Sequence, residues 1–113
     1  MQIYKIFRAE EFSAFEAAGK TAGAPVDLAD GYIHFSTAAQ VAETAAKHFA
    51  GESDLVLLGL EADALGDALK WEPSRGGALF PHLYREMTSA DVLWVQPIPL
   101  GPDGVHVLPE DLG

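Results

Sequence analysis

The strongest hydrophobic pattern in the chain is an apolar run at its centre. Residues 55–60 read Leu-Val-Leu-Leu-Gly-Leu, without the alternation of a half-exposed strand. Such a run is typical of a strand that is covered on both faces. Residues 3–7 and 92–95 are rich in β-branched and aromatic side chains and also predict strands. Pro97 and Pro99 follow the last of these and place it toward a sheet edge.

Two early segments have the spacing of helices. Residues 8–18 carry two phenylalanines three positions apart and are followed by a glycine stop signal. Residues 37–49 open with Thr-Ala-Ala-Gln, which has the form of a capping box, and then carry an apolar stripe at every fourth position. Residues 20–30 hold glycine, proline and aspartate without periodicity, so we expect a loop there.

Shorter segments complete the pattern. We expect further strands at residues 32–35, 70–72 and 80–84, and turns at residues 63–69, 73–77 and 88–91. Two early helices followed by strands predict an α+β fold rather than a doubly wound sheet. We expect one domain over residues 1–113, with a core over about residues 2–99 and a short acidic C-terminal tail.

The net charge of the chain limits the classes of partner that it is expected to bind. Seventeen acidic residues against seven basic ones give a net charge of −10. Nucleic-acid binding depends on neutralising phosphates with a basic face, so we expect no bulk nucleic acid as a partner. A small anionic ligand is compatible with this charge, because a local cluster acts over about 8–10 Å.

Other compositional features bear on location and chemistry. No apolar run approaches the roughly 20 residues that cross a bilayer, so we expect no membrane partner. The first seven residues lack the pattern of a signal peptide. Cysteine is absent, which excludes thiolate chemistry and fits a cytoplasmic location.

His34 is the first candidate for chemistry. Strand alternation places Tyr32, His34 and Ser36 on one face. The strand runs into the capped helix start at Thr37, where free backbone amides favour an anion. The structural alternative is a partly buried histidine that binds a backbone carbonyl.

His82 is the second candidate, and three of the seven basic residues bracket it: Lys70, Arg75 and Arg85. Arg75 begins an Arg-Gly-Gly sequence that could wrap backbone amides and a guanidinium around a phosphate. The alternatives are an ordinary turn and a surface histidine. His48, in the last helical turn, is interpreted as a charge that complements the helix dipole.

A metal site is a further alternative. His34, His48 and His82 with an aspartate such as Asp30 could supply three or four ligands. No H-x-H or H-E-x-x-H pair supports this reading, so we expect no metal.

Together, residues 3–6, 26–37, 70–72 and 80–84 resemble the bacterial domain-of-unknown-function family numbered 952, and the resemblance covers about residues 2–99. That family is grouped with the ADP-ribosyltransferase-like fold, which holds NAD in the cleft of a split, strongly curved sheet. Ile33-His34-Phe35-Ser36-Thr37 is similar to the second-strand motif of that superfamily, especially of the RNA 2′-phosphotransferases.

The chain departs from the superfamily pattern at two places. The superfamily enzymes carry an Arg or His on the first strand, and the corresponding position in this chain is Lys5 or Tyr4. The third-strand Glu of the arginine- and diphthamide-modifying toxins has no clear counterpart. The pocket and His34 therefore carry over, and no established reaction does.

The resemblance implies a transferase-like domain that binds NAD or another small phosphorylated nucleotide. His34 and His82 would be its catalytic residues, with His34 on the ribose or nicotinamide end and His82 as acid–base or ligand contact. The binding residues would be Lys5, Tyr32, Ser36, Thr37, Arg75, Tyr84 and Arg85. The alternatives are a noncatalytic ligand-binding or interaction domain that uses the same cleft, and a histidine-based metalloenzyme.

Overall fold

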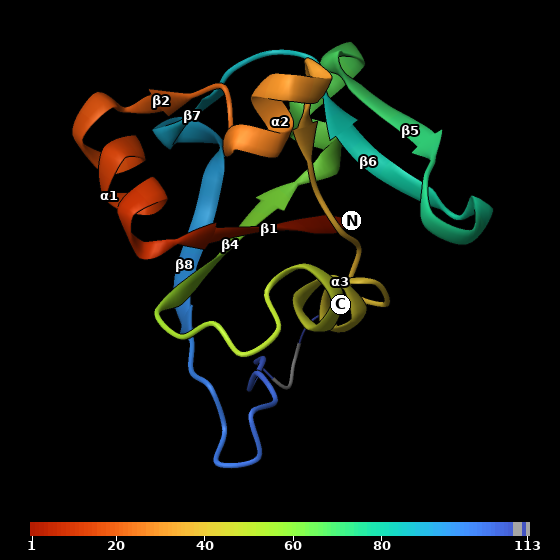
Figure 1. Ribbon diagram of the computed structural model, residues 1–113. Helices are drawn as coiled ribbons and strands as arrows, with labels where there is room; N and C mark the ends of the chain where they lie inside the picture. The colour runs from red at the N-terminus through yellow and green to blue at the C-terminus, as the bar shows by residue number, and fades with distance from the viewer. Residues whose placement is uncertain (110–111, 113) are drawn as a thin grey trace.

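The computed structural model describes residues 1–109 and 112, apart from the side chain of Arg75. In chain order the elements are β1 (Gln2–Arg8), α1 (Ala9–Ala18), β2 (Lys20–Thr21), α2 (Pro25–Asp30), β3 (Ile33–His34), α3 (Val41–His48), β4 (Leu55–Glu61), the 3₁₀ segment η1 (Ala62–Ala68), β5 (Leu69–Pro73), η2 (Arg75–Gly77), β6 (Leu79–Leu83), β7 (Met87–Thr88), η3 (Ser89–Asp91) and β8 (Val92–Ile98). Helices and antiparallel sheets mix along the chain, so the α+β class is confirmed (Figure 1).

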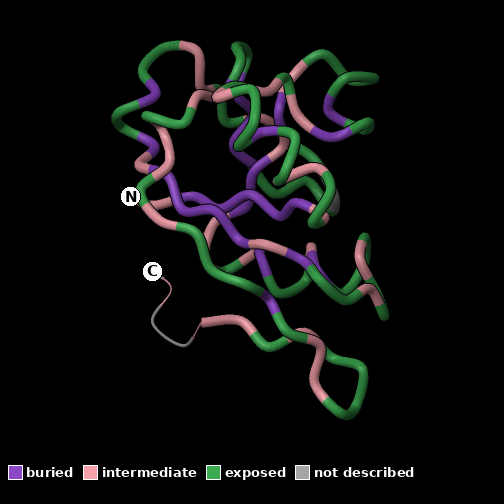
Figure 2. Tube along the Cα trace, turned by 90° about the vertical axis from the view of Figure 1, so that its left-hand side faces the viewer, coloured by how far each residue is buried: buried purple, intermediate pink, exposed green. Residues whose placement is uncertain are grey.

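The central sheet has the order β1-β4-β8, with both pairings antiparallel. Leu57, Leu58 and Leu60 of the middle strand are fully buried, as the apolar run predicts. Long buried stretches coincide with β1 and β4, whereas only Ile98 of β8 is buried (Figure 2). Strand β8 lies at the sheet edge with Pro97 inside it, which agrees with the position expected for a proline-bearing strand.

Strand β1 is buried on both faces. Ile3 and Phe7 point into one cluster, where Phe15 of α1 packs. Tyr4 and Ile6 point into a second cluster, against the apolar stripe of α3. Because side chains alternate along β1, this strand contributes to both hydrophobic clusters.

A glycine allows the closest approach within this sheet. The pairing of β4 with β8 shifts register between Gly59 and Leu60. A Cβ atom at Gly59 would overlap the indole ring of Trp94. Because this space is open, Trp94 packs against Tyr4 with ring centroids 5.9 Å apart and donates a hydrogen bond to Gln2 over 3.1 Å.

The loop expected over residues 20–30 is wrong, because this segment forms β2 and α2. Helix α2 begins with Pro25 at its first turn, where the missing N–H costs nothing. The side chain of Asp27 accepts a hydrogen bond from the backbone N–H of Ala24 over 2.7 Å. Gly31 ends the helix in the left-handed region, at φ 86°. Proline, aspartate and glycine act here as helix boundaries rather than as loop residues.

The strand predicted over residues 32–35 is shorter than expected, and β3 pairs with β6 in a second sheet of order β3-β6-β5. This antiparallel register sets His34 directly opposite His82. Gln40 donates a hydrogen bond to the carbonyl of Leu79 over 2.8 Å and so ties the start of α3 to the β5–β6 hairpin. Among the described residues, no helix has both the length and the apolar character needed to cross a membrane.

Candidate functional site

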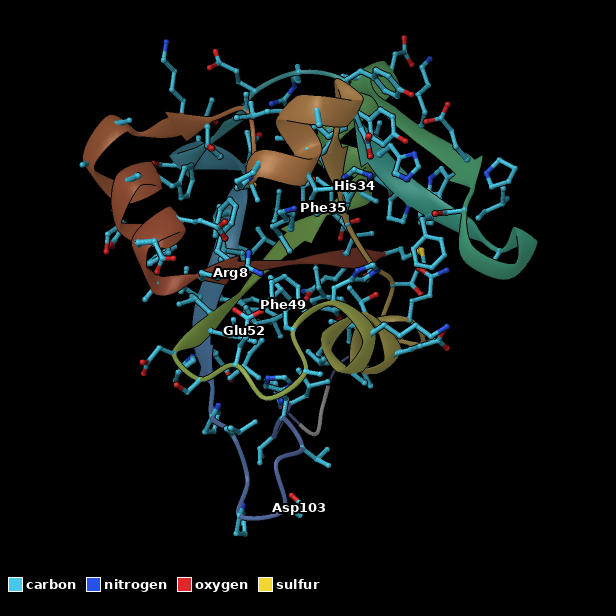
Figure 3. All side chains as sticks on the ribbon, viewed as in Figure 1. Arg8, His34, Phe35, Phe49, Glu52 and Asp103 are labelled. Carbon is cyan, nitrogen blue, oxygen red and sulfur yellow. The ribbon has the colours of Figure 1, made fainter. Side chains whose placement is uncertain are left out.

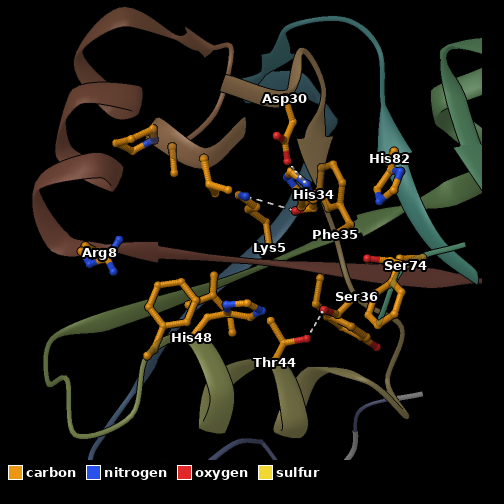
Figure 4. A pocket seen from close by; sticks show the side chains of 17 residues that line it. Lys5, Arg8, Asp30, His34, Phe35, Ser36, Thr44, His48, Ser74 and His82 are labelled. Atoms are coloured by element: carbon orange, nitrogen blue, oxygen red, sulfur yellow. Dashed lines mark hydrogen bonds and ion pairs between the residues drawn. The ribbon is translucent and has the colours of Figure 1, made fainter. Parts of the chain in front are cut away.

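A cavity opens where β1 separates from the chain that follows β3. One antiparallel bridge joins Tyr4 to Ser36, with backbone hydrogen bonds of 2.8 and 2.9 Å. On one side of this bridge the two segments diverge, and a cavity of about 520 Å³ lies there (Figure 4). Strand β1 contributes Lys5 and Arg8 to its wall, α3 contributes Thr44 and His48, and the paired strands contribute both strand histidines.

A buried ion pair holds one wall of the cavity. The ammonium group of Lys5 donates to Asp27 over 2.7 Å and to the carbonyl of His34 over 3.1 Å. The side chains of Lys5 and Asp27 are only 6% and 0% exposed. Burial lowers the pKa of Lys5, although Asp27 opposes this shift. Burial alone would raise the pKa of Asp27, but hydrogen bonds from His34 and the Lys5 charge outweigh it, and the pKa lies below its usual value.

The ring of His34 lies between two carboxylates. Its Nδ1 atom is 2.6 Å from Asp27, and its Nε2 atom is 3.0 Å from Asp30 at the end of α2. The side chain is 30% exposed. The contacts of the two ring nitrogens with Asp27 and Asp30 fix the plane of the ring.

The ring of His82 is far more enclosed. It is 3% exposed, its Nδ1 atom lies 2.8 Å from Glu72, and Tyr32 stacks on its face with centroids 4.2 Å apart. The rings of His34 and His82 meet edge to face, with centroids 5.2 Å apart. The Nε2 atom of His82 is buried and has no hydrogen-bond partner among the described residues.

The carboxylate beside His82 also binds a tyrosine. Tyr84 donates from its hydroxyl to Glu72 over 2.6 Å. This bond raises the pKa of Tyr84 to about 12, and the bonds from Tyr84 and His82 lower the pKa of Glu72. Tyr32 and Tyr84 lie side by side, with centroids 5.1 Å apart. Glu72, His82 and the two tyrosines thus form one connected group.

The model of the family described as "Protein of unknown function (DUF952)" matches residues 6–95. The chain belongs to this family. It is similar to the crystal structure of protein CC0527 from Caulobacter crescentus, with 51% identity, a TM-score of 0.91 and coverage of 96% of this chain and 95% of that one. The solution NMR structure of CC0527 is 52% identical with a TM-score of 0.83, and 92% of this chain and 90% of that one are covered. No curated protein matches the chain.

In this DUF952 chain, several residues that the sequence nominated for binding are engaged with other protein groups. Ser36 is buried and its hydroxyl lies 2.9 Å from that of Thr44. The backbone N–H of Thr37 donates to the side chain of Gln40 over 3.0 Å, as one half of a capping box. The amide of Thr37 therefore serves the start of α3.

Of the two arginines nominated for phosphate binding, Arg85 is also engaged with another protein group. The guanidinium of Arg85 makes two bonds with Asp91, over 2.9 and 3.1 Å, and Arg85 does not line the cavity beside His34. The side chain of Arg75 lies outside the described residues. Tyr32 makes ring contacts with both histidines, Tyr84 binds Glu72, and neither tyrosine lines the cavity beside His34.

Three residues of the site were not nominated as binding residues by the sequence: Asp27, Arg8 and His48. Asp27 lay in the segment interpreted as a loop, although its place two residues after Pro25 is a helix-start signal. His48 lines the cavity as well as lying in the last turn of α3, so the dipole interpretation is incomplete. Among the described residues, no group of three or more His, Asp or Glu side chains is placed to hold a metal ion.

Proposed function

We propose that this DUF952 chain binds NAD or a related phosphorylated nucleotide in the cavity beside His34 and His82, as a transferase-like domain of the ADP-ribosyltransferase-like fold. The diverging segments of β1 and β3 support this assignment, because they leave a cleft between two antiparallel sheets. His34, Phe35 and Ser36 of the Ile33–Thr37 block line the cavity, where the resemblance places the nucleotide.

One observation carries the proposal: the buried Nε2 atom of His82 lacks a partner in the part of the chain that the structure describes, beside a cavity of about 520 Å³. An unpaired buried polar group costs about 1–3 kcal/mol. A ligand hydroxyl or amide that donates to this nitrogen would recover that cost. Drug-sized ligands occupy sites of roughly 300–1,000 Å³, so the cavity has room for a large part of a nucleotide.

The residues around the cavity suit a transfer at the ribose. In such a transfer the bond between the ribose C1′ atom and the nicotinamide nitrogen breaks, its electron pair leaves with nicotinamide, and an acceptor forms the new bond to C1′. His34 would hold the ribose end, and His82 would accept a proton from the acceptor group. Of the phosphate contacts expected from the sequence, Lys5 is held by Asp27 and the side chain of Arg75 lies outside the described residues, so Arg8 of the cavity wall is proposed as the phosphate contact, through charge-assisted hydrogen bonds.

Binding is tested by the melting temperature with NAD, ADP-ribose, AMP and nicotinamide. A ligand at one hundred times its Kd adds about 2.7 kcal/mol, and saturating NAD or ADP-ribose should therefore raise the melting temperature by about 10 °C. The shift should shrink in His34→Gln. It should persist in His106→Gln, because His106 binds the carbonyl of Glu52 outside the cavity. A flat response to every nucleotide at several millimolar would overturn the proposal.

Turnover separates the transferase from a noncatalytic binding domain. Release of nicotinamide from NAD, followed by chromatography, should be faster with the native chain than with His82→Gln. Binding without any release would support the binding domain instead. A melting temperature that falls on addition of a chelator would support the metalloenzyme.

A further inference from the structure

We propose that Asp30 determines specificity in this cavity by binding the 2′- and 3′-hydroxyls of a ribose that carries no phosphate there, while the ligand's phosphate lies toward Arg8 and His48. This inference rests on the proposed function, because it assigns the two ends of the same nucleotide.

The carboxylate of Asp30 is placed to receive donors from a ligand. It lines the cavity from the last residue of α2 and is 45% exposed (Figure 4). One oxygen, Oδ2, lies 3.0 Å from the Nε2 atom of His34. Within residues 1–109 and 112, Oδ1 makes no hydrogen bond. A carboxylate has about four acceptor positions, so most of those on Asp30 face open space.

Charge decides which part of a nucleotide fits at this end. Asp30 lines the cavity beside His34, whereas Asp27 is buried behind the ring and is paired with Lys5. A phosphate placed at this end would meet the Asp30 carboxylate at short range, and like charges repel. A pair of neighbouring hydroxyls would instead donate to the carboxylate, as ribose hydroxyls do to the acidic residue of dinucleotide sites.

The opposite end of the cavity carries the groups that suit a phosphate. Arg8 and His48 lie there, away from Asp30, as Figure 4 shows. Three of the five N–H groups of Arg8 point to Glu11 and Glu52. The other two remain for a bound anion among the described residues. Arg8 also lies over the ring of Phe49, 4.9 Å from its centroid, which holds the guanidinium in place.

Three small probes measure this specificity: AMP, 2′-deoxy-AMP and adenosine 2′,5′-bisphosphate. The native chain should bind AMP about tenfold more tightly than 2′-deoxy-AMP, which matches the loss of one hydrogen bond to a charged group. The bisphosphate should bind at least tenfold more weakly than AMP, since its second phosphate meets Asp30. Kd values from titration calorimetry give both ratios.

Substitution of the carboxylate assigns these ratios to Asp30. Asp30→Asn should reduce the preference for AMP over the bisphosphate to below about threefold, because the amide no longer repels the phosphate. Asp30→Glu should keep the native order of the three probes. Asp67→Asn is the matched control, because this exposed carboxylate lies outside the cavity and its substitution changes the same charge.

The outcomes distinguish the two proposals. Equal affinity for AMP and 2′-deoxy-AMP in the native chain would overturn the role of Asp30 and leave the nucleotide site standing. An Asp30→Asn chain that keeps the native ratios would do the same. A native chain that binds none of the three probes, nor NAD or ADP-ribose, would overturn both.

Discussion

The two histidines of the cavity are each paired with a carboxylate, but the pairs are built in opposite ways. In the first pair the carboxylate of Asp27 is fully buried and the ring of His34 is 30% exposed. In the second pair the ring of His82 is 3% exposed and the carboxylate of Glu72 is 39% exposed. Figure 3 shows His34 among the side chains that fill the space between the elements.

The difference assigns a different physical role to each pair. Asp27 accepts hydrogen bonds from Lys5, His34 and the backbone of Ala24, so it joins β1, α2 and β3 into one unit. Glu72 binds His82 and Tyr84 at the surface of one sheet. The buried carboxylate therefore contributes to the fold, whereas the more exposed one raises the pKa of Tyr84.

The largest effect is expected from Asp27→Ala. The substitution leaves the buried ammonium of Lys5 without its partner, and breaking a buried ion pair in this way costs about 3–5 kcal/mol. Chemical denaturation measures the loss. The double variant with Lys5→Met should recover a good part of it, because the stranded charge is then removed. Equal stability of the single and double variants would mean that Lys5 contributes little to the cost.

Acid should weaken the fold through the same carboxylate. The pKa of Asp27 lies below its usual value of 3.8 in the folded chain. Its stabilising contribution is therefore complete above the usual value and is lost as the pH falls through the lowered one. Denaturation between pH 5 and pH 2 should show this loss. Glu72→Gln should leave most of it in place, and disappearance of the acid limb in that variant would contradict the assignment.

Substitution of the rings themselves should have a smaller effect. His34→Gln removes one of the several donors to Asp27 and should cost about 1–2 kcal/mol. His82→Phe should stay within about 1 kcal/mol of the native chain, because it keeps the stacking on Tyr32 and removes a buried nitrogen that lacks a partner. Denaturation midpoints compare the two variants. A loss above 3 kcal/mol in His82→Phe would show that its bond to Glu72 supports the fold.

The smallest effect on stability is expected from Glu72→Gln, within about 0.5 kcal/mol as for other exposed positions. Its signature is instead a titration. Tyr84 has a pKa of about 12 because it donates to the Glu72 carboxylate, and the neutral amide should return the pKa close to 10.0. Ultraviolet absorbance against pH follows the phenolate. An unchanged titration curve would place the hydroxyl of Tyr84 away from residue 72.

Much of the fold follows from local sequence. The apolar run of β4 and the stripe of α3 identify a central strand and a packed helix, and both are present. Helix α2 was missed because its composition resembles that of a loop, although Pro25 and Gly31 mark its two ends. Six residues are too few to show a helical period.

The candidate site is less accessible to sequence analysis. The alternation of side chains along a strand predicts the face on which His34 lies. Some of the residues that contact His34, however, come from segments distant along the chain. Lys5 and Asp27 are 22 residues apart, and His34 and His82 meet through strand register. Arg85 lies near His82 in sequence, yet a nearby carboxylate holds its side chain. The local sequence pattern predicts which residue types could form a site. Long-range strand pairing and ion pairs then determine which of these residues contact one another.

The open space above Gly59 has an optical consequence. It lets Trp94 pack against Tyr4, which lines the cavity, while the chain's other tryptophan, Trp71, is 39% exposed on the β5–β6 hairpin. The two indoles therefore emit from different surroundings, one partly buried against Tyr4 and one more open to quenchers in solution. Iodide would quench the emission of Trp71 first and leave that of Trp94. The remaining fluorescence of Trp94 would then report on changes at the cavity wall.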